Sequence, residues 1–114
     1  MPDVCNLDRL RNISMGDDEF AGELVRVFLD DSVIQLERLR VAVESSDCSE
    51  VAEAAHRLKG AGGNVGAEIL AEVCHDVEVA GRSGSVEALG KGLEAIDREL
   101  NRARAVFESE LGVG

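Results

Sequence analysis

The sequence has no tryptophan, no tyrosine and a single proline, Pro2. Aromatic residues make up 3% of the 114 residues, whereas hydrophobic residues make up 45%. A core of this composition has to be built from Leu, Val, Ile and Ala, as is common in helix bundles. Because proline interrupts helices and none follows position 2, long helices are allowed along the rest of the chain. The composition therefore favours an all-α fold.

Basic residues are scarce beside acidic ones. The chain has 12 Lys and Arg against 23 Asp and Glu, which gives a net charge of −11 at pH 7. Such a charge repels nucleic-acid backbones and anionic membrane surfaces. No apolar run approaches the roughly 18 residues that a membrane-spanning helix needs. We expect neither a nucleic-acid partner nor a membrane contact.

Cysteine is also sparse, with Cys5, Cys48 and Cys74 widely separated and no Cys-x-x-Cys pattern. An odd number at this spacing suggests neither a disulfide framework nor a zinc site. The first residues lack the basic and apolar regions of a signal peptide. We expect a soluble, cytoplasmic protein that forms a single domain over residues 1–114.

The spacing of apolar residues predicts five helices. A short helix is expected over about 6–14, and four longer helices over about 17–110, with breaks near 45–47, 64–66 and 81–84. Short turns between long amphipathic helices favour an antiparallel up-down-up-down four-helix bundle with a short extra N-terminal helix. In the second helix, a broad core face is expected from Phe20, Leu24, Val27, Phe28, Ile34, Leu36, Leu39 and Val43.

The segment from Ala55 to Gly63 contains the residues best suited to take part in a reaction. On a helix, His56 points away from the apolar positions Ala54 and Leu58, so its side chain is expected to face solvent. The same geometry places four residues on the face of His56: Ala52, Lys59, Gly60 and Gly63.

Two interpretations of this segment stay open on spacing alone. Each glycine inside a helix lowers the stability of the helix by about 1 kcal/mol relative to alanine. The presence of Gly60, Gly62 and Gly63 therefore needs an explanation. They could belong to a helix end beside an ordinary surface histidine. Alternatively, they admit a partner protein to a histidine that carries a phosphoryl group, with Lys59 beside the phosphoryl oxygens. The chain has no GxxxxGK[ST] loop and no GxSxG turn, so nucleotide-driven and serine-hydrolase chemistry lack their motifs.

The chain resembles the histidine-containing phosphotransfer (HPt) domains of multistep phosphorelays. The resemblance is carried by the HxLKG pattern of residues 56–60 and extends over nearly the whole chain. The further matching residues are Gly16-Asp17, Phe28-Leu29-Asp30-Asp31, Val65-Gly66-Ala67, Leu70, Cys74, Glu78 and Gly81-Arg82-Ser83-Gly84. Ala61-Gly62 departs from the family, in which two serines often stand at these positions.

The resemblance implies that His56 takes a phosphoryl group from a receiver-domain aspartate and passes it to another. Lys59 would stabilise the phosphoryl group, and Gly60 and Gly63 would give the partner access. Glu78 stands where the family often has Gln, and we expect it to orient the histidine ring. Ala52 and Arg57 are expected to contact the docked partner.

The expected partners are receiver domains of a hybrid sensor kinase or a response regulator. The chain itself is expected to be a monomer without catalytic turnover and without a cofactor, any Mg²⁺ belonging to the receiver partner.

Three other hypotheses compete with this one. Glu53 with His56, and Glu72 with His75, repeat the Glu-x-x-His spacing of di-metal carboxylate bundles. A non-catalytic adaptor bundle would use the same bare face for docking alone. His75 is a second candidate phosphoacceptor, but its helix offers it acidic neighbours and no lysine. The sequence ranks all three below phosphotransfer at His56.

Overall fold

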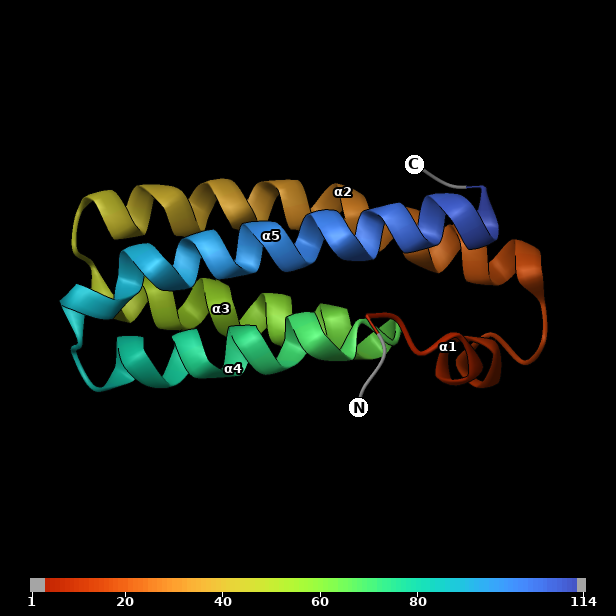
Figure 1. Cartoon of the computed structure of the whole chain (residues 1–114), viewed down its shortest axis with the longest axis horizontal. Coiled ribbons are helices and arrows are strands. Elements are labelled where there is room, and N and C mark those ends of the chain that lie inside the picture. Colours follow the sequence, from red (N-terminus) through yellow and green to blue (C-terminus); the bar gives the residue numbers. More distant parts are fainter. Residues whose placement is uncertain (1–3, 113–114) are drawn as a thin grey trace.

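The computed structural model describes residues 4–112 as five helices, with no strand among them. Four long helices lie side by side along the longest axis, and the short helix sits at one end (Figure 1). The helices are α1 (Leu7–Ile13), α2 (Asp18–Glu44), α3 (Cys48–Asn64), α4 (Glu68–Arg82) and α5 (Val86–Leu111). Consecutive long helices run in opposite directions, which confirms the predicted antiparallel bundle. The predicted domain bounds also include residues 1–3 and 113–114, which lie outside the described residues.

Acidic side chains cap the start of two of the long helices. The Asp17 carboxylate accepts a hydrogen bond from the Phe20 amide at 3.1 Å, and the Asp47 carboxylate accepts one from the Glu50 amide, also at 3.1 Å. Both bonds satisfy amides that have no partner within the helix. Ser85 occupies the cap position of α5, but its side chain makes no capping hydrogen bond.

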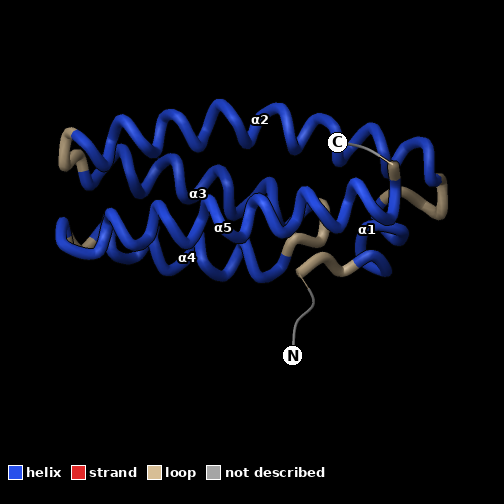
Figure 2. Tube along the Cα trace, turned by 45° about the horizontal axis from the view of Figure 1, so that its top comes forward, coloured by secondary structure: helices blue, strands red, loops and turns tan. Residues whose placement is uncertain are grey.

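The unequal helix lengths leave the place that α1 fills. The helices α2 and α5 have 27 and 26 residues, and α3 and α4 have fewer. Because a helix rises about 1.5 Å per residue, α3 and α4 do not reach as far along the bundle. The short helix covers the resulting gap at the end of the bundle, beside the turn between α3 and α4 (Figure 2). The Asn6 amide donates to the Gly66 carbonyl at 2.7 Å, and the Arg9 Nε donates to the Gly63 carbonyl at 2.9 Å. The N-terminal helix is therefore anchored to the end of the helix that carries His56.

The core is aliphatic, as the lack of aromatic residues requires. Within α3, Val51, Ala54, Ala55 and Leu58 are buried, and within α5 so are Leu89, Ile96, Leu100, Ala103 and Phe107. Phe28 and Phe107 pack edge to face, with ring centroids 6.3 Å apart.

The predicted core face of α2 is partly wrong. Phe20, Val27 and Ile34 are 41%, 69% and 65% exposed, whereas Phe28 and Leu39 are buried. The three exposed residues, together with Val41, which is 51% exposed, recur every seven positions. Seven residues make nearly two helical turns, so the four side chains share one face of α2. We call Phe20, Val27, Ile34 and Val41 the α2 stripe.

Candidate functional site

His56 lies in the middle of α3 with its side chain 57% exposed. Val51, Ala54, Ala55 and Leu58 all face the core at no measurable exposure. Because these positions define the inner face of the helix, His56 and Arg57 are turned outward. The predicted solvent-facing position of His56 is confirmed.

Glu78 reaches the histidine ring from α4. Its carboxylate oxygens lie 3.1 and 3.2 Å from Nδ1 of His56, and its side chain is only 9% exposed. A buried carboxylate needs polar partners, and this one is oriented towards the edge of α3 that carries the ring. The structure thus brings together the two residues that the family resemblance pairs.

Two basic side chains complete the contacts of this carboxylate. Lys59 Nζ lies 2.7 Å from Oε1, and Arg82 donates to Oε2 from Nε at 3.0 Å and from its terminal nitrogen at 2.8 Å. The hydrogen bond from Lys59 is the main cause that lowers the pKa of Glu78 to about 2; partial burial opposes the shift, and Arg82 and His56 add to it. Glu78 is therefore ionised at neutral pH.

The charge of Glu78 determines which ring nitrogen of His56 holds the proton. An ionised carboxylate can only accept hydrogen bonds, so Nδ1 of His56 has to donate. In a neutral ring the other nitrogen, Nε2, then carries the lone pair. In that neutral form His56 has one unprotonated ring nitrogen, and it is not the one that faces Glu78.

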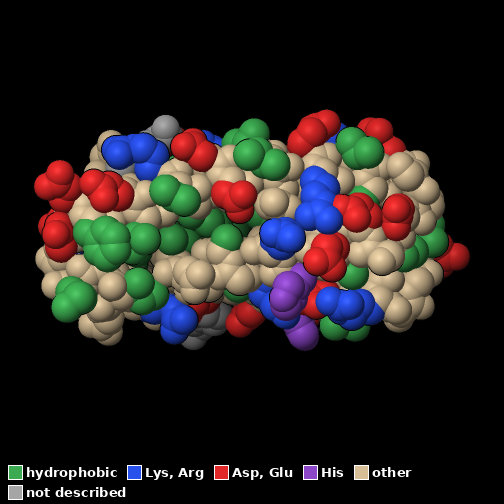
Figure 3. Space-filling model, turned by 180° about the vertical axis from the view of Figure 1, so that it is seen from behind, with side chains coloured by type: hydrophobic (Ala, Val, Ile, Leu, Met, Phe, Trp, Pro, Cys, Tyr) green, Lys and Arg blue, Asp and Glu red, His purple; other side chains and the backbone are tan. Residues whose placement is uncertain are grey.

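The surface around His56 has few side chains of its own. A Cβ at Gly60 or Gly63 would find no atom within 4 Å beyond its local neighbours, so both positions border open space. Gly62 is different, because a Cβ there would touch the Ala67 carbonyl and Leu70 at 3.5 Å. Arg57 is exposed and has no ion-pair partner among residues 4–112. On the face that carries the histidines, basic and acidic side chains lie interspersed (Figure 3).

Ala52 does not belong to this surface. It is 2% exposed, and it packs where α4 comes closest to α3: a Cβ at Gly81 would stand 3.1 Å from the Cβ of Ala52. The prediction that Ala52 contacts a docked partner is wrong, because helical spacing alone does not reveal which side the neighbouring helix covers.

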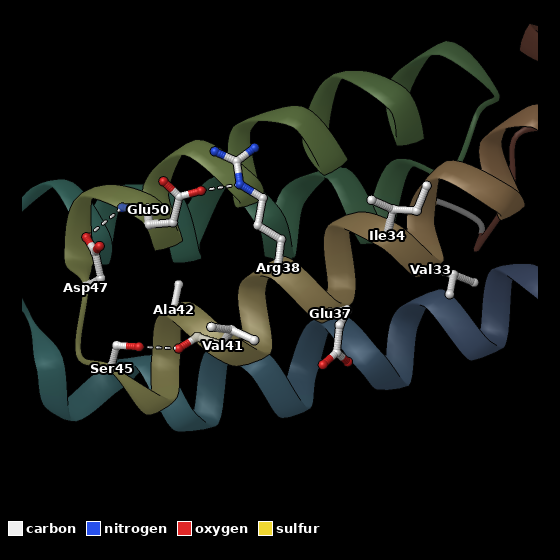
Figure 4. A pocket seen from close by; sticks show the side chains of 9 residues that line it. All are labelled: Val33, Ile34, Glu37, Arg38, Val41, Ala42, Ser45, Asp47 and Glu50. Carbon is white, nitrogen blue, oxygen red and sulfur yellow. Dashed lines mark hydrogen bonds and ion pairs between the residues drawn. The ribbon is translucent and has the colours of Figure 1, made fainter.

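Two shallow grooves lie between α2 and α3. One, of about 600 Å³, is lined by Val27 of α2 and Ala61 of α3, with residues of α1. The other, of about 610 Å³, is lined by Ile34 and Val41 and lies near the connection to α3. Figure 4 shows Arg38 reaching across the second groove from α2 to an ion pair with Glu50 on α3. The α2 stripe thus runs beside the helix that carries His56.

His75 is exposed on α4 and lines a shallow hollow together with Lys59, Ala71, Glu72 and Asp76. Its own helix carries no lysine, as expected, but Lys59 approaches it from the neighbouring helix. Unlike His56, it has no hydrogen-bond partner among residues 4–112 to orient its ring.

Potential metal ligands do not cluster. Within residues 4–112, no group of three or more His, Cys, Asp or Glu side chains is arranged to hold a metal ion. Glu53, His56, Glu72 and His75 therefore do not form the di-metal centre that their spacing allows. No helix of the described part is long and apolar enough to cross a membrane.

Comparison with known sequences decides the family. The Hpt domain model matches residues 23–106, which include the whole of α3 and α4. The chain belongs to the Hpt domain family. Hpt domains transfer phosphoryl groups through a histidine in phosphorelays, generally as stoichiometric relay proteins and in exchange with receiver domains. Among curated proteins, no significant sequence match exists.

Solved structures of HPt proteins share the fold over nearly the full length. Histidine-containing phosphotransfer protein B (HptB) from Pseudomonas aeruginosa PAO1 is 25% identical, with a TM-score of 0.90 over 98% of this chain and 97% of that one. A putative histidine-containing phosphotransfer protein from rice is 20% identical, with a TM-score of 0.84 over 96% and 80%. The HPT domain of a sensor hybrid histidine kinase from Shewanella is 21% identical, with a TM-score of 0.80 over 96% and 94%.

Proposed function

We propose that His56 is the phosphoacceptor of this HPt domain and that it shuttles a phosphoryl group between the aspartates of two receiver domains. The observation that carries the proposal is the contact of 3.1 Å between Nδ1 of His56 and the buried, ionised carboxylate of Glu78. This contact orients the ring and leaves Nε2 as the exposed nucleophile.

The transfer uses the lone pair of Nε2. This pair forms the bond to phosphorus, while the bond between phosphorus and the aspartate oxygen breaks and its electrons leave with the receiver's carboxylate. The ring keeps its Nδ1 proton, which faces Glu78, so the ring gains the positive charge that the carboxylate stabilises. Transfer to the second receiver is the reverse of these steps.

Lys59 is proposed to stabilise the phosphoryl oxygens. It follows His56 by three residues, so both side chains leave neighbouring turns of α3 on one side. Its ammonium is 2.7 Å from Glu78, within the same group of contacts as the ring. The Mg²⁺ that assists this chemistry is proposed to belong to the receiver domain, and no cofactor is assigned to this chain.

The docking surface is proposed to extend from His56 across α3 to α2. Gly60 and Gly63 leave room for a partner to approach the ring closely, and Arg57 offers a positive charge to the acidic pocket of a receiver. The α2 stripe supplies apolar area beside them, which interfaces bury at their centre. We propose that the protein acts in the cytoplasm as a monomer and a single domain.

A non-catalytic adaptor would use the same surface without any chemistry, so the test has to separate binding from transfer. The chain is incubated with receiver domains that carry radiolabelled aspartyl phosphate. We expect an acid-labile, alkali-stable label on the chain and none on His56→Gln, which should still bind the receiver. A wild-type chain that binds receivers without taking label would support the adaptor function instead.

A further inference from the structure

Glu78 contacts more charged partners than ring orientation requires. A ring is oriented by one acceptor, and an uncharged amide would provide it. Here the acceptor is an ionised carboxylate that also contacts Lys59 through Oε1 and Arg82 through Oε2. In the unphosphorylated protein, a network of ion pairs therefore lies directly beside the proposed phosphoacceptor.

We propose, on the basis of the function proposed above, that the charge of Glu78 limits how long the phosphoryl group stays on His56, because the carboxylate competes with the phosphoryl oxygens for Lys59. Glu78 is thus a positioning residue with a second role in setting the lifetime of phosphohistidine.

The competition follows from the geometry of Lys59. Its ammonium is 2.7 Å from Oε1 of Glu78 in the unphosphorylated protein, and its side chain is 30% exposed. A phosphoryl group on Nε2 of His56 presents a second, stronger anion to the same ammonium. Arg82 pairs with the other oxygen, so Glu78 keeps its position when Lys59 turns to the phosphoryl group.

The proton on Nδ1 acts in the same direction. When phosphohistidine hydrolyses, the water oxygen bonds to phosphorus, the N–P bond breaks and its electron pair returns to Nε2. Both water protons leave with the dihydrogen phosphate. The ring departs as neutral imidazole only if Nδ1 is protonated, and the Glu78 carboxylate at 3.1 Å favours that proton.

Glu78→Gln separates ring orientation from charge. The amide oxygen still accepts the hydrogen bond from Nδ1, and the side chain has nearly the same volume. The charge that holds Lys59 is gone. The Lys59 side chain is 30% exposed, and an ion pair that solvent still reaches changes an equilibrium by up to about fivefold. We therefore expect phospho-His56 to last about fivefold longer in this variant.

The full chain is phosphorylated with phosphoramidate, whose P–N bond breaks with loss of ammonia. After the donor is removed, the loss of phosphohistidine is followed by phosphorus NMR. The variants are Glu78→Gln, Lys59→Gln, the double variant, Glu53→Gln, and His56→Gln, which identifies the phosphohistidine signal that belongs to His56. Glu53 is exposed one helical turn before His56 and has no contact with Lys59, so it controls for the loss of charge alone.

We expect Glu78→Gln to lengthen the lifetime only when Lys59 is present. Three results would each overturn the inference: an unchanged lifetime, an equal effect in the Lys59→Gln background, or an equal effect of Glu53→Gln. None of them would contradict the proposed function of His56. A wild-type chain without a phosphohistidine signal, or the same signal in His56→Gln, would instead overturn the proposed function, and the inference with it.

A second variant covers the case in which Glu78→Gln does not fold. Arg82 is 59% exposed and Lys59 still pairs with Glu78 in its absence, so Arg82→Gln should fold. Without Arg82, Glu78 holds Lys59 more tightly, and we expect phospho-His56 to decay faster than in the wild type. A lifetime that is unchanged or longer would contradict the competition.

Discussion

Gly81 of α4 lies directly against Ala52 of α3. A Cβ at position 81 would stand 3.0 Å from the amide nitrogen of Ala52 and 2.8 Å from the carbonyl oxygen of Cys48. Only glycine allows the two helices to approach this closely. Because Glu78 precedes Gly81 by one turn and His56 follows Ala52 by one turn, the close approach also sets the contact between Glu78 and the ring.

Gly81→Ala should therefore damage both the fold and the site. Forcing a methyl group into this contact is expected to lower the free energy of unfolding by about 1–3 kcal/mol and to slow labelling of His56 by phosphoramidate. Gly90→Ala is the matched control, because a Cβ at that helical position meets no atom within 4 Å. It should raise stability by about 0.4–1 kcal/mol. Urea unfolding of both variants measures the difference, and equal effects would contradict the close-contact account.

Gly60 offers a test of partner access. In the free protein, Gly60→Ala should raise the free energy of unfolding by about 0.5–1 kcal/mol, because the helix interior favours alanine and nothing opposes the added methyl group. Gly60→Leu should strongly slow labelling by a phosphorylated receiver while leaving labelling by phosphoramidate unchanged, since only the protein partner needs the open space. Equal slowing with both donors would mean that Gly60 acts on the histidine rather than on docking.

Glu78 should make stability depend on acid pH. Its pKa in the folded protein is about 2, below its usual 4.5, chiefly because Lys59 donates a hydrogen bond to it. A lowered folded-state pKa contributes stability that is fully present above the unfolded-state pKa and is lost as the pH falls through the folded-state value. The stability difference between the wild type and Glu78→Gln should thus decline from about pH 5 towards about pH 2. Urea unfolding across this range measures it; a constant difference would show that Glu78 is not held ionised.

The α2 stripe should matter for docking and not for folding. Val27→Ser and Ile34→Ser replace side chains that are 69% and 65% exposed, so the free energy of unfolding should change by no more than about 0.5 kcal/mol. Transfer from a receiver should slow several-fold at subsaturating receiver concentration. Val86→Ser, at an exposed position at the start of α5, is the control that should leave transfer unchanged. Equal rates in all three variants would remove the stripe from the docking surface.

Regular periodicity explains why most of the fold could be predicted. In α3, small and apolar residues recur on one face only, and all of Val51, Ala54, Ala55 and Leu58 are buried. In α2 the apolar residues occupy two faces. Periodicity cannot tell which of two apolar faces meets the core. It therefore predicts that Phe20, Val27 and Ile34 of the α2 stripe are buried, although all three are exposed.

The site was predictable where it depends on one helix and less so where it depends on two. The outward position of His56 follows from the spacing of α3 alone. The burial of Ala52 follows from Gly81 on another helix, which no local pattern reveals. Arg82 was missed as a member of the site, although its spacing of four residues from Glu78 is the spacing of helical ion pairs and could have indicated the contact.

Transfer between two receivers tests the central claim most directly. A receiver carrying radiolabelled aspartyl phosphate is mixed with a second, unphosphorylated receiver, and the chain is added as wild type, His56→Gln or His75→Gln. The account predicts that label reaches the second receiver with the wild type and with His75→Gln, and that it stays on the first with His56→Gln. Label that reaches the second receiver with His56→Gln would contradict the assignment of His56 as the phosphoacceptor.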